Sequence, residues 1–63
     1  MALGSREKFL KIYANLPLSV RSEIIAVLAD GKPITWDAAF LEVDNNTEQS
    51  IIILEKLEKL GLI

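Results

Sequence analysis

The residues best suited to covalent chemistry are the hydroxyl-bearing side chains, namely Ser5, Tyr13, Ser19, Ser22, Thr35, Thr47 and Ser50. A hydroxyl attacks a carbonyl or phosphoryl centre efficiently only when a neighbouring general base takes its proton, and histidine is the usual base. The sequence contains no histidine and no cysteine. It also has no glycine-rich phosphate loop and no paired-carboxylate motif. We therefore expect the protein not to be an enzyme, to have no catalytic residues and to bind no cofactor.

Oxygen-bearing side chains follow one another in one stretch, at Glu42, Asp44, Asn45, Asn46, Thr47 and Glu48. Carboxylate and amide oxygens are the ligands that Ca²⁺ prefers. However, the stretch lacks the central glycine and the bidentate closing glutamate of an EF-hand loop. We interpret it as a solvated loop and expect no metal site.

Nucleic-acid binding would depend on the cations and amides at Arg6, Lys8, Lys11, Arg21, Lys32 and Gln49. Binding through counterion release needs several cations on one face of the molecule. The formal net charge of -2 provides no overall field that would attract a polyanion. We interpret the cations as a solvated surface. A nucleic-acid patch that includes Arg6, Lys8, Lys11, Lys32 and Gln49 remains the alternative.

Apolar residues recur at helical spacing in the segments that must position these side chains, at Ser5–Asn15, Ser19–Ala29, Thr35–Asp44 and Thr47–Leu60. Each of the last three segments begins with a serine or threonine that can act as an N-cap. Proline or glycine and asparagine turn residues separate the segments. The sequence therefore predicts an all-α fold, with four short helices in one domain over residues 1–63, disorder over residues 1–4, and no strand hairpin.

The last helix is the most fully specified segment. Its main apolar seam consists of Ile53, Leu54, Leu57 and Leu60. Gly61 fits the C′ position of a Schellman motif, in which Leu62 would fold back on Leu57. The sequence therefore predicts where and how this helix ends.

Ile51 and Ile52 lie off that seam, so the first turns of the last helix are apolar nearly all round. Neighbouring segments could cover the two side chains inside the monomer, or the pair could contact a partner. Trp36 and Tyr13 could likewise be buried inside the monomer or contact a partner, because large aromatic side chains fill cores and also anchor interfaces. These four residues are the candidate interface.

The stretch from Arg21 to Ile63 resembles a helix-turn-helix domain of the winged-helix type. The segments that carry the resemblance are Glu23–Leu28, Thr35–Ala39 and the Leu-rich Leu54–Ile63. The resemblance implies a helix-turn-helix-like arrangement of the second to fourth helices, and DNA binding through the last. The chain stops at Ile63, so we expect no wing. The first turn of the last helix offers Glu48 and Gln49 rather than the arginines that read a major groove.

The amino-acid composition favours a protein–protein interaction role over a membrane or DNA-binding role. The chain is 51% hydrophobic over 63 residues, which is more apolar surface than one small core readily hides. No run of about 18 apolar residues suggests a membrane span. We expect a cytoplasmic protein–protein interaction or oligomerisation module, which acts as a homodimer or with another protein partner. A DNA-binding regulator of helix-turn-helix type without a wing is the alternative.

Overall fold

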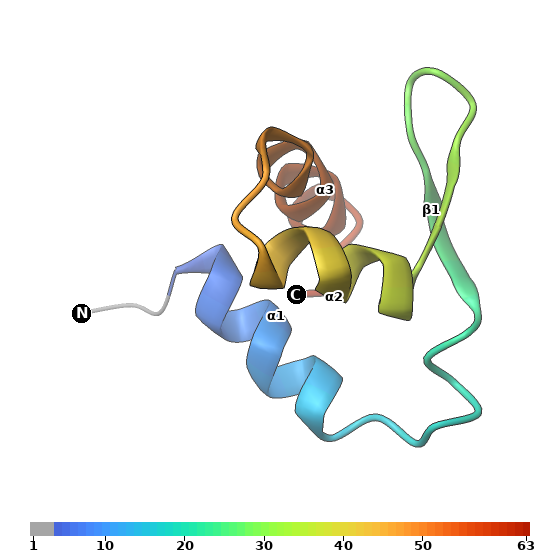
Figure 1. Ribbon diagram of the computed structural model, residues 1–63, viewed down its shortest axis with the longest axis vertical. Helices are drawn as coiled ribbons and strands as arrows, with labels where there is room; N and C mark the ends of the chain where they lie inside the picture. Colours follow the sequence, from blue (N-terminus) through green and yellow to red (C-terminus); the bar gives the residue numbers. More distant parts are fainter. Residues whose placement is uncertain (1–3) are drawn as a thin grey trace.

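The computed structural model describes residues 4–63 and contains three helices and one two-stranded antiparallel sheet. In chain order the elements are α1 (Ser5–Ala14), β1 (Ile24–Val27), β2 (Pro33–Thr35), α2 (Trp36–Asp44) and α3 (Glu48–Lys59). The helices pack together, and the β-hairpin stands at one side of them (Figure 1). The disorder predicted for residues 1–4 falls mainly on residues 1–3, which lie outside the described residues.

The prediction of an all-α fold with four helices is wrong, because Ser19–Ala29 does not form a helix. Residues 17–23 form successive turns, in which Val20 N–H donates to Pro17 O at 3.0 Å and Glu23 N–H donates to Val20 O at 3.0 Å. The chain then extends into β1, which pairs with β2. Four apolar residues in a row, three of them β-branched, suit a strand at least as well as a helix.

The dipeptide Asp30-Gly31, which follows the segment predicted to be the second helix, lies in the turn of this hairpin. Gly31 N–H donates to Leu28 O at 2.8 Å, and Leu28 N–H donates to Lys32 O at 2.9 Å. Gly31 has φ of 85°, which glycine adopts without a steric penalty. Asp30 Oδ1 accepts from Lys32 N–H at 3.0 Å. This is the three-residue hairpin loop in which a tight turn is followed by a left-handed glycine.

The other predicted helices are confirmed to within one residue at each end. Thr35 caps α2, because its hydroxyl accepts from Ala38 N–H at 3.0 Å. Thr47 caps α3 in the same way and accepts from Ser50 N–H at 3.1 Å. Side-chain caps of this kind satisfy amide groups that the first turn of a helix leaves unpaired.

The Schellman end of α3 is also confirmed. Leu62 N–H donates to Leu57 O at 3.0 Å, and Gly61 N–H donates to Glu58 O at 3.0 Å. Gly61 has φ of 75°. This pair of bonds with a left-handed residue at C′ defines the motif.

One apolar core joins the helices to the hairpin. Its largest fully buried side chains are Phe9, Ile34, Val43, Ile53 and Leu57, which come from α1, β2, α2 and α3. From the hairpin, Ala26 and Leu28 are also buried. The hairpin therefore replaces the predicted helix as one wall of the core. Among the described residues, no helix has the length and apolar character needed to cross a membrane.

Candidate interaction surface

Ile51 and Ile52 are exposed on the outer side of α3, at 60% and 52% of their maximal accessible surface. No other segment of the described chain covers them to any large extent. The opposite side of the same helix is buried through Ser50, Ile53 and Leu57. The helix thus has one apolar side in the core and a second apolar patch in solvent.

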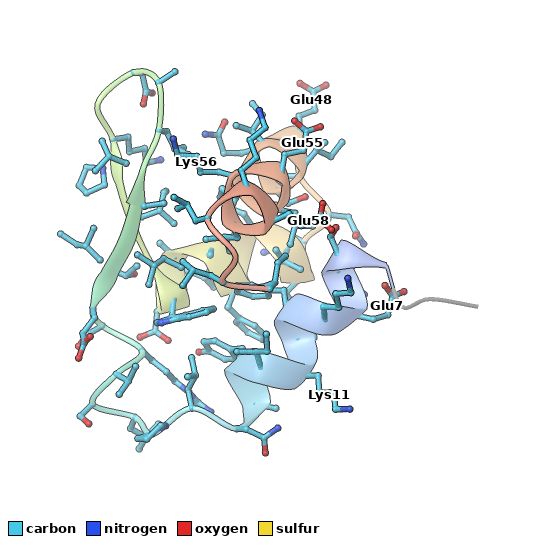
Figure 2. All side chains as sticks on the ribbon, turned by 180° about the vertical axis from the view of Figure 1, so that it is seen from behind. Glu7, Lys11, Glu48, Glu55, Lys56 and Glu58 are labelled. Atoms are coloured by element: carbon cyan, nitrogen blue, oxygen red, sulfur yellow. The ribbon has the colours of Figure 1, made fainter. Side chains whose placement is uncertain are left out.

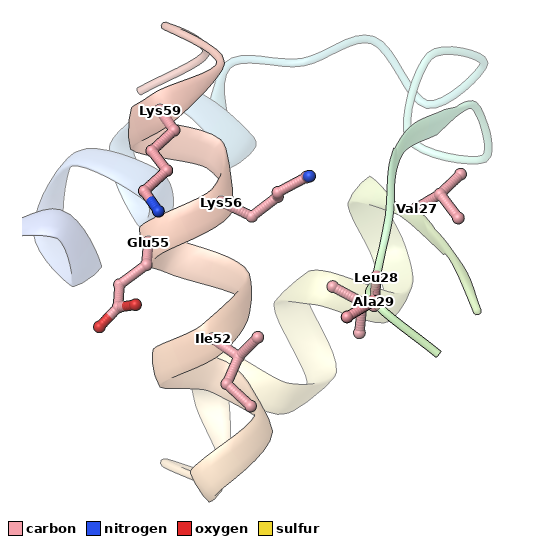
Figure 3. Close-up of a pocket in the computed structure, with 7 residues that line it drawn as sticks. All are labelled: Val27, Leu28, Ala29, Ile52, Glu55, Lys56 and Lys59. Atoms are coloured by element: carbon pink, nitrogen blue, oxygen red, sulfur yellow. The ribbon is translucent and has the colours of Figure 1, made fainter. Parts of the chain in front are cut away.

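A hollow of about 250 Å³ lies between α3 and the hairpin. Its lining comes from Val27, Leu28 and Ala29 of the hairpin and from Ile52, Glu55, Lys56 and Lys59 of α3. A second hollow of about 210 Å³ continues it past Asp30 and Gln49. Figure 3 shows Ile52 and Lys56 directed toward the hairpin across this space. We call the two hollows together the α3–hairpin groove.

Charged side chains follow a definite order along the exposed side of α3. Glu48 lies in the first turn of the helix, whereas Lys56 and Lys59 lie in the last turn. Figure 2 shows Glu48 at one end of the helix and Lys56 extending toward the hairpin. The exposed side of α3 therefore begins acidic and ends with two lysines, with Glu55 between.

Trp36 and Tyr13 lie elsewhere, in an aromatic cluster between α1 and α2. The ring of Trp36 lies 5.8 Å from that of Phe9, and the indole residue is only 7% exposed. The ring of Tyr13 stacks on Phe40 with centroids 4.3 Å apart. The structure therefore places these two candidates in and against the core, and not beside Ile51 and Ile52.

Tyr13 also joins the turns after α1 to the start of α2. Its hydroxyl donates to Asp37 Oδ1 at 2.6 Å, and the guanidinium of Arg21 lies 4.4 Å from its ring centroid. Arg21 Nη2 donates to Tyr13 O at 3.2 Å. Hydrogen bonding to the Asp37 carboxylate raises the pKa of Tyr13 above its ordinary value, with smaller contributions from burial and from the Asp37 charge. Arg21 therefore contacts both the ring and the backbone carbonyl of Tyr13, and so helps to hold the turns after α1 in place.

The residues considered for nucleic acid fall into two separate groups, one on α1 and one at the hairpin and α3. Arg6 Nε donates to Asn46 Oδ1 at 3.1 Å, and Lys8 and Lys11 lie on the same helix, α1. Lys32 lies in the hairpin turn, at the far side of the molecule from α1 (Figure 1). Gln49 lines the α3–hairpin groove opposite Asp30.

The acidic loop between α2 and α3 serves the fold. Thr47 Oγ1 donates to Glu42 Oε1 at 3.1 Å. Asn46 has φ of 52° in the turn, a conformation that asparagine tolerates better than most residues. Within residues 4–63, no group of three or more acidic, histidine or cysteine side chains is placed to hold a metal ion.

The hairpin side of the groove could not be derived from a predicted helix over Ser19–Ala29. The signal that would have revealed it is Asp30-Gly31 between two apolar runs, which is a strong hairpin indicator.

In comparisons with protein families, with curated proteins and with solved structures, the chain matches none. The geometry of the groove is therefore the basis for a functional proposal.

Proposed function

We propose that the protein is a small, non-enzymatic protein–protein interaction module that associates with itself through the exposed side of α3. The observation that carries the proposal is the exposure of Ile51 and Ile52 on a helix whose other side forms the core. Removing a half-exposed isoleucine from water stabilises an interface by roughly 1 kcal/mol. Two such residues on each protomer give a dimer four apolar anchors.

Chain size supports the same proposal. A domain of about 60 residues buries only about 60% of the surface that its unfolded chain exposes, so its stability is marginal. Association with a second copy adds buried surface that the single core lacks. The sequence has no cysteine for a disulfide and no histidine for a zinc site, and these are the usual supports of a small fold.

The positions of the hydroxyl groups support a non-enzymatic role. Thr35 and Thr47 accept hydrogen bonds from the first turns of α2 and α3. The hydroxyl of Tyr13 donates to Asp37. In each case the oxygen is held in a hydrogen bond of the fold, and the chain contains no histidine, which is the usual base that activates a hydroxyl nucleophile.

Sedimentation equilibrium at tens of micromolar tests the proposal. We expect a species of twice the 7.0 kDa chain mass for the native sequence, and a monomer for Ile52→Glu, because a carboxylate cannot enter an apolar contact without a large desolvation cost. Leu41→Glu is the matched control, since Leu41 on α2 is 60% exposed. That control should stay dimeric. A native chain that remains monomeric at this concentration would refute self-association.

DNA binding is the second candidate, and the arrangement of α2 and α3 favours it. The two helices are joined by the short turn Asn45–Thr47, as in helix-turn-helix modules. The acidic first turn of α3 and the separation of Lys32 from α1 make it the weaker proposal. It predicts duplex binding that weakens steeply with salt. Titrations at low salt that show no binding to duplex DNA would remove it.

A further inference from the structure

We propose that the second copy packs its α3 antiparallel to α3 of the first, in the α3–hairpin groove, with Glu48 opposite Lys59 of the partner subunit. This inference rests on the proposed self-association and gives it a geometry. By twofold symmetry the same ion pair then forms twice, once at each end of the paired helices.

The proposed pairing starts from the spacing of charged and apolar residues on the exposed side of α3. Glu48, Ile52, Glu55 and Lys59 follow one another at intervals of four, three and four residues, which places them in one row along a helix. All four side chains are exposed. The row therefore has an acidic end, an apolar and acidic centre, and a basic end.

Charge complementarity decides the direction of packing. Two parallel copies of this row place Glu48 against Glu48 and Lys59 against Lys59, which repel. Two antiparallel copies place Glu48 opposite Lys59 of the partner subunit and Ile52 opposite Glu55 of the partner subunit. Both Ile52 side chains then lie close to the twofold axis, and the aliphatic stem of each Glu55 packs against Ile52 while its carboxylate stays in solvent. The antiparallel arrangement also opposes the two helix dipoles, which is favourable. Lys56 then lies opposite Ile51 of the partner subunit, where its aliphatic stem can cover that side chain.

The area that a stable dimer needs brings the hairpin into the contact. A standard interface buries about 800 Å² on each partner, which is roughly a fifth of the 4231 Å² surface. The twelve residues of α3 span only about 18 Å, so one side of the helix is too small by itself. The hollow of about 250 Å³ beside the helix supplies the rest, because a helix seated over α3 also contacts Val27 and Ala29.

A charge exchange tests this geometry. Glu48→Lys places two lysines together at both ends of the dimer, and we expect its dissociation constant to rise about tenfold or more. Lys59→Glu should weaken the dimer similarly. The double variant Glu48→Lys/Lys59→Glu restores both opposite-charge pairs and should return the dissociation constant close to the native value. Glu23→Lys, an exposed residue before β1, makes the same charge change outside the groove and should have little effect.

Thermal unfolding of each variant separates the interface from helix stability. Each substitution opposes the α3 dipole, so a purely structural role predicts that the double variant is the weakest of all. A dimeric native chain whose double variant does not recover, or whose single variants dimerise normally, overturns the antiparallel geometry and leaves self-association standing. A monomeric native chain overturns both proposals.

Discussion

At the scale of single residues, Tyr13 shows how one residue can connect three segments. Its ring packs on Phe40, its carbonyl accepts from Arg21, and its hydroxyl donates to Asp37. The sequence suggested Tyr13 as a core residue or an interface anchor. Its aromatic character indicated burial, but the partners lie 8 and 24 positions away along the chain, so spacing within one helix could not reveal them.

The Tyr13–Asp37 bond predicts a measurable pH dependence. Because only the protonated phenol can donate, the carboxylate raises the pKa of Tyr13 above its ordinary value of about 10. A folded-state pKa above the unfolded value stabilises the fold at pH below about 10, and this contribution is lost as the pH rises through the folded pKa. Ultraviolet absorbance titration of this single tyrosine should therefore give a midpoint above 10.

Two substitutions should move that midpoint in opposite directions. Asp37→Asn removes the acceptor charge and should lower the pKa of Tyr13, whereas Arg21→Gln removes a nearby cation and should raise it further. A midpoint that is the same in the native chain and in Asp37→Asn would show that the hydrogen bond is not formed in solution.

At the scale of secondary-structure elements, local signals predicted the ends of helices well and the type of one element wrongly. Thr35, Thr47 and Gly61 act within a few residues of their own backbone, so their roles follow from the sequence. The strand over Ile24–Val27 exists because β2 pairs with it, and pairing between segments is not visible in the period of either one. The apolar spacing of Ser19–Ala29 satisfied a helical template by coincidence.

The left-handed end of α3 predicts a specific cost for Gly61→Ala. A Cβ at this position meets nothing within 4 Å, so the substitution changes only the backbone preference at φ of 75°. We expect a loss of about 1 kcal/mol in the free energy of unfolding, measured by urea denaturation. Gly61→Asn should lose less, because asparagine tolerates this conformation better. Equal stability of all three chains would contradict a left-handed Gly61.

At the scale of the whole molecule, the exposed apolar surface and the small size of the chain both support the proposed self-association through α3. Ile51 and Ile52 are exposed side by side on α3, and Ile52 also lines the hollow between α3 and the hairpin. The pair was recognised in the sequence as a surplus beyond the main seam. The groove beside it was not, because it depends on the hairpin. The α3 side of the candidate surface was therefore predictable from the sequence, whereas the hairpin side was not, because it depends on strand pairing.

The proposed self-association predicts that the melting temperature of the native chain depends on its concentration, because folding and association are then coupled. Since a dimer unfolds to two chains, a tenfold increase in protein concentration stabilises each protomer by about 0.7 kcal/mol, which is half of RT ln 10. For a domain of this size, that corresponds to a rise of about 3–6 °C in the melting temperature. Circular dichroism melts across two decades of concentration measure the slope. Ile52→Glu should melt at a temperature that does not change with concentration, and Leu41→Glu should retain the native slope. A flat native profile would mean that the exposed side of α3 contributes nothing to the stability of the fold through self-association.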